Sequence, residues 1–254
     1  MGIGAWIGAL LVGLVLGLLG SGGSILTVPV LVYLVGVPDK LAIAESLGIV
    51  TLISGVGAIP FAIQQKVSWR SVVLFGLPGM AGAYLGALSS DFIPGALQLA
   101  LFAVVMLVAA VLMFRKTALH HRDDAPRAAW KIMLDGLFVG ALTGLVGVGG
   151  GFLIVPALVL LGGLPIHLAI GTSLWIIAIK SIGGFYKYVD LLGIEQMHWN
   201  LMLIFGAVGV VGSFIGGRMG AYVPQEKLKR IFAAFLLVMG VVILWQNAAS
   251  LLGA

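Results

Sequence analysis

The stretch Gly17–Gly48 reads GLLGSGGSILTVPVLVYLVGVPDKLAIAESLG, and the stretch Gly144–Trp175 reads GLVGVGGGFLIVPALVLLGGLPIHLAIGTSLW. The two stretches align without a gap at a separation of 127 residues, and 18 of their 32 positions are identical. Both prolines of each stretch coincide, as do three glycines of each cluster. Chance similarity between apolar helices does not place prolines and spaced glycines in register. The chain is therefore a duplication of one unit.

The repeat extends beyond these stretches in both directions. Upstream, Gly13 corresponds to Gly140 at the same separation. Downstream, an insertion of three residues changes the separation to 130. The matching pairs there are Trp69 and Trp199, Gly76 and Gly206, Gly79 and Gly209, Gly82 and Gly212, Gly86 and Gly216, and Pro94 and Pro224.

Composition places the chain in a lipid bilayer. Of its 254 residues, 61% are hydrophobic and 9% are charged, and the mean hydropathy is +1.19. A soluble domain carries about 25% charged residues. The chain therefore has too little polar surface to cover a globule in water. The first apolar segment follows no basic region of the kind that precedes a cleaved signal peptide, so we expect it to be retained.

Apolar segments define the expected helices. A spanning helix needs about 20 residues, and two segments, 24–36 and 151–163, are too short to cross alone. We expect an all-α integral membrane protein with 8–10 membrane segments, arranged as two homologous helical repeats that each contain a short helix broken by glycine. The segments are 3–20, 24–36, 41–64, 71–88, 95–114, 132–147, 151–163, 167–187, 199–217 and 228–247.

Charge predicts the boundaries and orientation of the repeats. We expect repeats over 1–114 and 132–254, joined by a polar cytoplasmic linker over 115–131. Lys and Arg gather in that linker and in the loops 65–70 and 218–230, and such loops face the cytoplasm. If residues 3–36 form a bent hairpin, all three basic regions lie inside and the repeats are inverted, with both termini outside. A single crossing would place 218–230 outside, so we favour inversion.

The glycine clusters are the expected binding site. Gly20, Ser21, Gly22, Gly23 and Ser24 in the first repeat correspond to Gly147, Val148, Gly149, Gly150 and Gly151 in the second. Short segments interrupted by glycine at corresponding places in two halves indicate the binding site of a transporter. The N-termini of the restarted helices would bind an anion through free N–H groups. The alternative is that these glycines only allow close helix packing.

Two ionisable residues inside the expected spans are further candidates. Glu45 is a candidate proton carrier and Lys180 a candidate anion ligand, because ionisable residues within spans are costly and are functional by default. The inverted topology places them at one depth, where they could also pair. The alternative is that Lys180 extends to the interface.

Hydroxyl side chains complete the predicted site. Ser46, Thr172 and Ser173 follow the paired prolines and are candidate ligands, although hydroxyl groups also form ordinary bonds between helices.

The chain has no cysteine, and its histidines lack metal-ligand spacing. Neither glycine cluster has the context of a nucleotide-binding loop. We therefore expect no metal, no cofactor and no nucleic-acid partner.

The motif Gly-x-Gly-Gly-(Ser/Gly)-x-Leu-x-x-Pro occurs at Gly20–Pro29 and again at Gly147–Pro156. It resembles the repeated signature of the TauE/SafE sulfite exporter family, and the resemblance covers nearly the whole chain. It implies a multi-pass permease of the bacterial or archaeal inner membrane that exports sulfite, sulfoacetate or a related organosulfur anion. One difference is that Ser21 and Ser24 have no hydroxyl counterpart in the second repeat.

Two other functions can be compared with these sequence features. An anion channel on the same scaffold has the same sequence features. A serine protease built around Ser21 would need a histidine base within the membrane, and no expected span contains one in its interior, since His167 is the first residue of 167–187. We therefore predict a transporter of a small anion rather than an enzyme. Proton coupling is possible through Glu45, and the sequence does not indicate an oligomeric state.

Overall fold

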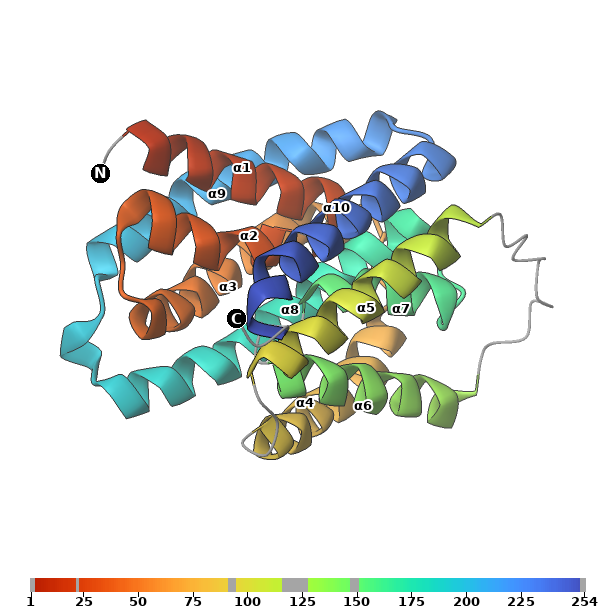
Figure 1. Ribbon diagram of the computed structural model, residues 1–254. Helices are drawn as coiled ribbons and strands as arrows, with labels where there is room; N and C mark the ends of the chain where they lie inside the picture. The colour runs from red at the N-terminus through yellow and green to blue at the C-terminus, as the bar shows by residue number, and fades with distance from the viewer. Residues whose placement is uncertain (1–2, 22, 91–94, 116–127, 147–150, 252–254) are drawn as a thin grey trace. The chain divides into compact units, whose positions relative to one another are not determined.

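The computed structural model describes residues 3–21, 23–90, 95–115, 128–146 and 151–251, which are helical apart from short connections (Figure 1). These residues contain no β-strand, which confirms the predicted all-α class. The helices of the first repeat are α1 (Ile3–Leu19), α2 (Gly23–Pro29), the π-helix η1 (Val30–Val35), α3 (Asp39–Ile63), α4 (Trp69–Ser90) and α5 (Gly95–Phe114). Those of the second are α6 (Ala129–Val146), the 3-10 helix η2 (Gly151–Leu153), α7 (Ile154–Leu160), α8 (Ile166–Leu192), the 3-10 helix η3 (Ile194–Gln196), α9 (Trp199–Tyr222) and α10 (Gln225–Leu251).

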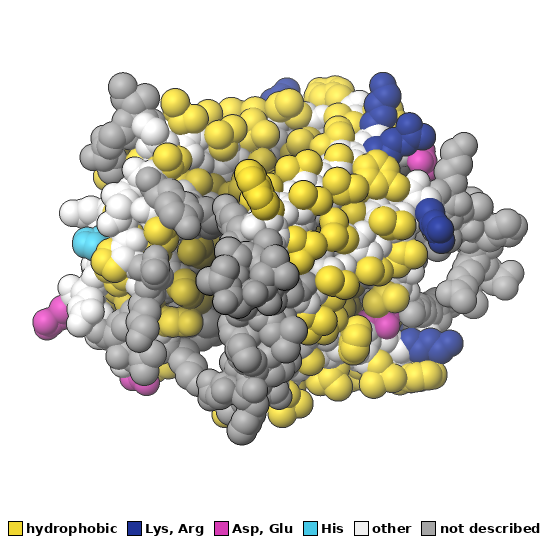
Figure 2. All heavy atoms as spheres, viewed as in Figure 1, with side chains coloured by type: hydrophobic (Ala, Val, Ile, Leu, Met, Phe, Trp, Pro, Cys, Tyr) yellow, Lys and Arg dark blue, Asp and Glu magenta, His cyan; other side chains and the backbone are white. Residues whose placement is uncertain are grey.

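Several of these helices suit a bilayer. Within the described residues, Leu41–Ile63, Ile166–Asp190 and Trp199–Tyr222 are long and apolar enough to cross one. Large hydrophobic side chains such as Leu77, Phe138 and Val238 are more than half exposed, and hydrophobic atoms cover most of the described surface in Figure 2. Lipid can cover this apolar surface, whereas its exposure to water would be unfavourable. The protein is an integral membrane protein.

The chain packs as two compact units, each drawn from both repeats. Unit 1 comprises residues 1–72 and 167–223, and unit 2 comprises residues 73–166 and 224–254. The predicted repeats, 1–114 and 132–254, are defined by the duplicated sequence, and their boundaries stay a prediction. Most of the predicted linker, 116–127, lies outside the described residues. Packing therefore groups helices by contact and not by their order in the chain.

The first repeat begins with a helical hairpin in unit 1. Helix α1 ends at Leu19, and the chain turns back through Gly20, whose φ of +76° favours glycine. Along the returning arm, Gly23 lies against Leu16, and Leu34 then lies beside Gly4 near the start of α1. The contact order is therefore antiparallel. This is the bent hairpin on which the prediction of inverted repeats depends.

Each unit contains a parallel helix pair held by small residues that has a repeat-related counterpart in the other unit. In unit 1, α1 packs along α9, with Gly13 against Gly209 (Figure 1). In unit 2, α6 packs along α4, with Gly140 against Gly79. Gly13 corresponds to Gly140 and Gly79 to Gly209, so the same contact occurs twice, each time between helices of different repeats. Small residues allow such close approach of membrane helices. A second repeat-related set is Gly212 against Leu10 and Leu14, and Gly82 against Leu137 and Ala141.

Three long helices of unit 1 position the candidate site. Helix α3 runs parallel to α9, with Leu52 near Gly206 and Gly57 near Ser213. It runs antiparallel to α8, with Leu47 near Gly184 and Gly55 near Ala178. The C-terminal ends of α3 and α9 therefore lie near the N-terminal end of α8. In unit 2, α5 packs along α10, where Gly240 contacts Leu107.

Candidate functional site

The glycine break of the first repeat lies against helix α8 of the second repeat. The hydroxyl of Ser173 lies 3.0 Å from the carbonyl oxygen of Gly20 and 2.8 Å from that of Ile170, and it can donate to either. A Cβ atom on Gly20 would come within 2.8 Å of the Cα atom of Ile170. The structure thus brings together two predicted site residues that are 153 positions apart.

The predicted hydroxyl ligands donate to backbone carbonyls in this structure. Ser24 donates to Ser21, Ser46 to Ile43 and Thr172 to Leu168, at 2.8, 2.7 and 2.6 Å. Thr172 also accepts a hydrogen bond from the backbone N–H of Ser68 at 2.9 Å. Because an anion needs donors, these hydroxyls would have to break their present bonds to bind one. Their role as ligands stays a prediction.

Several members of the two glycine clusters cannot be placed. Gly22, Gly147, Gly149 and Gly150 lie outside the described residues. Gly23 begins α2 and packs against α1, and Gly151 begins η2 and is buried. Ser21 is fully buried and has a partner. Most of the second glycine break therefore lies outside the described residues.

Glu45 and Lys180 occupy different depths in unit 1. Lys180 lies about 18 Å before the end of α8, because that helix continues to Leu192 instead of ending at 187. Glu45 lies about 9 Å inside the start of α3. Among the described residues, the side-chain partner recorded for Glu45 is His198, whose Nδ1 lies 2.9 Å from Oε1, and the alternative of a pair with Lys180 is not found.

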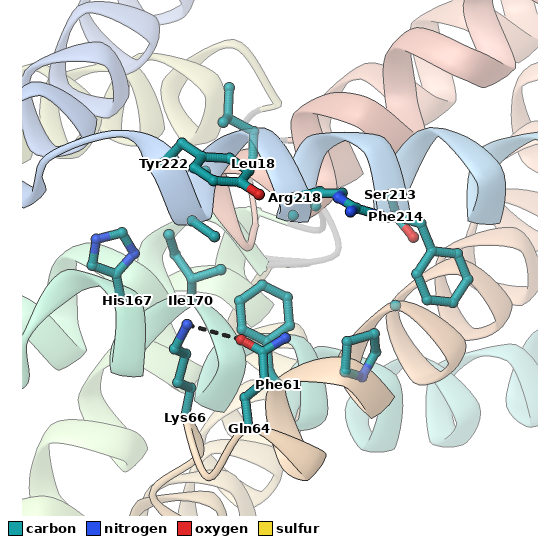
Figure 3. A pocket seen from close by; sticks show the side chains of 16 residues that line it. Leu18, Phe61, Gln64, Lys66, His167, Ile170, Ser213, Phe214, Arg218 and Tyr222 are labelled. Atoms are coloured by element: carbon teal, nitrogen blue, oxygen red, sulfur yellow. Dashed lines mark hydrogen bonds between the residues drawn. The ribbon is translucent and has the colours of Figure 1, made fainter.

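A cavity of about 490 Å³ opens at the other end of the same helices (Figure 3). Four helices of unit 1 and one loop surround it: the end of α1, the C-terminal half of α3, the start of α8 and the C-terminal half of α9, with the loop after α3. Its lining residues are Gly17, Leu18, Gly57, Pro60, Phe61, Gln64, Lys66, His167, Ile170, Ser213, Phe214, Gly217, Arg218, Gly220, Ala221 and Tyr222.

The polar lining of this cavity is basic. It includes Lys66, His167 and Arg218, while no Asp or Glu is among its described lining residues. In Figure 3, Lys66 and His167 lie across the space from α9, which carries Arg218. The Nζ atom of Lys66 donates to Oε1 of Gln64 at 2.8 Å. Positive groups in a partly enclosed space attract anions.

The cavity reaches the glycine break of the first repeat. Gly17 and Leu18, in the last turn of α1 before the break, line the cavity. Ile170 also lines it and contacts Gly20 on its other side. The break and the basic side chains therefore belong to one continuous region of unit 1.

Only part of this region is evident from the sequence. There, Lys66 and Arg218 are orientation signals, and His167 has no predicted role. A signal was nevertheless present, because the basic loops 65–70 and 218–230 follow two expected spans that end on the same side of the membrane. What the sequence lacked was the packing of α3 beside α9, which brings those two loops to one cavity.

Comparison with known proteins agrees with the glycine motif. Residues 5–243 match the family model described as Sulfite exporter TauE/SafE. A protein of Xylella fastidiosa strain Temecula1, named "Probable membrane transporter protein", is 35% identical over 248 residues, covering 95% of this chain and 94% of the relative. A probable membrane transporter protein of Methanocaldococcus jannaschii is 27% identical over 251 residues, covering 92% and 94%. No solved structure matches the chain. This bacterial and archaeal kinship confirms the predicted resemblance, and the chain belongs to the sulfite exporter TauE/SafE family.

Proposed function

We propose that the protein transports a small sulfur-containing anion, such as sulfite or sulfoacetate, out of the cell. We further propose that the basic cavity of unit 1 binds this anion on the cytoplasmic side of an inner membrane. The observation that carries the proposal is the cavity itself, in which Lys66, His167 and Arg218 are combined with no described acidic lining residue. The family of this chain and the names of its relatives support transport as the activity.

The chemistry of the lining suits an oxyanion. The guanidinium of Arg218 presents a planar fork of donors that matches two oxygens of one anion. Lys66 provides an ammonium group on the opposite side of the space (Figure 3). A volume of about 490 Å³ exceeds the share of a single water, roughly 30 Å³, many times. The cavity can therefore hold a small anion together with several waters.

We also propose that the two repeats cross the membrane in opposite directions. Contacts in unit 1 make α9 parallel to α3. Helix α4 follows α3 after a five-residue connection, 64–68, so it must return across the bilayer if both helices span it. The repeat-related helices α4 and α9 would then cross in opposite senses. This arrangement places Lys66, Arg218 and the basic linker on one side, as the distribution of positive charge favours.

The test is anion flux into proteoliposomes, measured separately for sulfite, sulfoacetate, sulfate and thiosulfate. The double substitution Lys66→Gln and Arg218→Gln removes two partly exposed donors, each contributing about 1 kcal/mol after allowance for solvent screening. Each kilocalorie corresponds to roughly a fivefold change, so we expect the apparent KM to rise about 25-fold. Lys227→Gln is the matched control, because Lys227 lies on α10 and does not line the cavity.

Three outcomes would contradict the proposal. Absence of saturable flux for all four sulfur anions would exclude the substrate class. An unchanged KM in the double variant would exclude the cavity as the binding site. Rapid, non-saturable flux with little dependence on temperature would indicate a channel instead of a transporter.

A further inference from the structure

Glu45 is a buried carboxyl group with one used and one unused oxygen. Its side chain is fully buried in unit 1, on helix α3. Oε1 accepts hydrogen bonds from both the backbone N–H and Nδ1 of His198, each at 2.9 Å. Oε2 has no hydrogen-bond partner among the described residues. Oε1 is therefore the oxygen through which this carboxyl group can exchange a proton with the imidazole.

His198 connects this buried carboxyl group to water. It is the residue immediately before α9, and 55% of its side chain is exposed. Its Nδ1 faces Glu45, while the ring has a second nitrogen, Nε2, that can exchange protons. The imidazole of His198 therefore contacts both solvent and the Glu45 carboxyl group, which solvent does not reach.

Other charged groups lie on the neighbouring elements α3, α8, η3 and α9. Among those whose side chains are described, none has a recorded ion pair with Glu45 or His198; they are Lys180, Asp190, Glu195 and Arg218. The side chains of Asp39, Lys40 and Lys187 are not described.

The pair lies at the opposite end of the helices that form the basic cavity. Glu45 lies on α3, and Gln64, the residue after its last, is 19 residues further along the chain, which is about 28 Å along a helix. His198 directly precedes α9, and Arg218 lies four residues before the last residue of α9, Tyr222. The hydrocarbon core of a bilayer is about 30 Å thick. Glu45 and His198 therefore face the side of the membrane away from Lys66 and Arg218.

We propose that Glu45 and His198 form a proton-binding site, in which His198 carries protons between water and the buried carboxyl group. This proposal deepens the proposed function and rests on it, because the bound proton would drive or accompany the anion. A proton from water adds to Nε2 of His198, and the proton on Nδ1 passes to Oε1 of Glu45. The imidazole returns to its neutral form and the carboxylate becomes neutral. Release follows the same route in reverse.

The first experiment detects the proton without any transported anion. Purified protein in lipid vesicles is titrated by infrared difference spectroscopy, which reports the C=O stretch of a protonated carboxyl group. We expect a pH-dependent band that is lost in Glu45→Gln and retained in Glu195→Gln, since Glu195 is exposed on η3. His198→Asn keeps an N–H donor for Oε1 but has no titrating nitrogen. After a pH jump, its band should form about a hundredfold more slowly, because a positioned acid–base group accelerates proton transfer by that order.

The second experiment connects the proton to transport. Vesicles that contain a pH-sensitive dye are given a thiosulfate gradient, and thiosulfate flux and internal pH are followed together. We expect the wild-type protein to move protons with thiosulfate and Glu45→Gln to move thiosulfate alone.

The outcomes separate the two proposals. An unchanged band in Glu45→Gln, or unchanged kinetics in His198→Asn, would overturn the proton site. Flux of thiosulfate without proton movement in the wild-type protein would overturn coupling. A band that behaves as expected in a protein without flux of any sulfur anion would overturn the proposed function and leave the proton site standing.

Discussion

The parallel helix pairs make a quantitative prediction about alanine at two related glycines. In unit 1, a Cβ atom on Gly13 would lie 2.6 Å from the carbonyl carbon of Gly209. In unit 2, a Cβ atom on Gly140 would lie 2.8 Å from the carbonyl carbon of Gly79. Favourable carbon–carbon contacts begin near 3.5 Å, and the carbonyl oxygens lie closer than the carbonyl carbons, so each pair of helices must separate by at least about 0.7–0.9 Å. The obstacle is backbone, which cannot move aside as a side chain can.

Gly55 provides the matched control for this prediction. It also lies within a long helix, α3, but a Cβ atom there would meet only the Cβ atom of Ala178, at 3.9 Å. Alanine at any of the three positions gains about 1 kcal/mol of helix propensity. The difference between Gly13→Ala or Gly140→Ala and Gly55→Ala therefore isolates the steric overlap, for which we expect about 1–3 kcal/mol.

The measurement is thermal unfolding in detergent, followed by the fraction of protein that remains monodisperse. For a chain of this size, 1 kcal/mol corresponds to a change of about 2–4 °C, so both variants should lie roughly 2–12 °C below Gly55→Ala. The two decreases should be similar, because repeat-related residues make equivalent contacts. Midpoints equal to that of Gly55→Ala would refute the close packing of α1 with α9 and of α6 with α4. A decrease in only one variant would refute their equivalence.

Two further predictions concern the glycine break and the topology. Ser173→Ala removes the hydroxyl that contacts the carbonyl oxygen of Gly20 and should lower the free energy of unfolding by about 1–3 kcal/mol. Ser46→Ala should have a smaller effect in the same unfolding assay, since its hydroxyl bonds within its own helix. A cysteine in place of Lys229 should react with an impermeant reagent only from the cytoplasmic side. Labelling from outside would contradict the inverted arrangement.

Much of the helical organisation could be predicted because it depends on local sequence. Composition required a membrane environment, and apolar length located the helices to within a few residues at most boundaries. The alignment of Gly17–Gly48 with Gly144–Trp175 identified the duplication. The turn at Gly20 was also predictable, because glycine tolerates a positive φ and a short apolar segment follows it.

Helix length limited the prediction for Lys180 and Glu45. The sequence suggested that α8 would end near Lys187, where polar residues begin, but the helix continues to Leu192. Measured from the end of α8 and the start of α3, Lys180 is therefore more than one helical turn deeper than Glu45. Polar residues beyond a hydrophobic segment do not stop a helix when its backbone bonds can continue, so the boundary could not be predicted from hydropathy alone.

The amino-acid sequence alone established the class of the protein, its duplication, its helices and its family. These properties follow from composition, from spacing along the chain and from residues that act on their immediate neighbours. Only the tertiary structure decided which partners meet: α1 with α9 and α6 with α4, Glu45 with His198, and Lys66 with His167 and Arg218 around one cavity. Such contacts join residues more than fifty positions apart. They depend on how helix surfaces fit together, and no local pattern in either repeat contains that information.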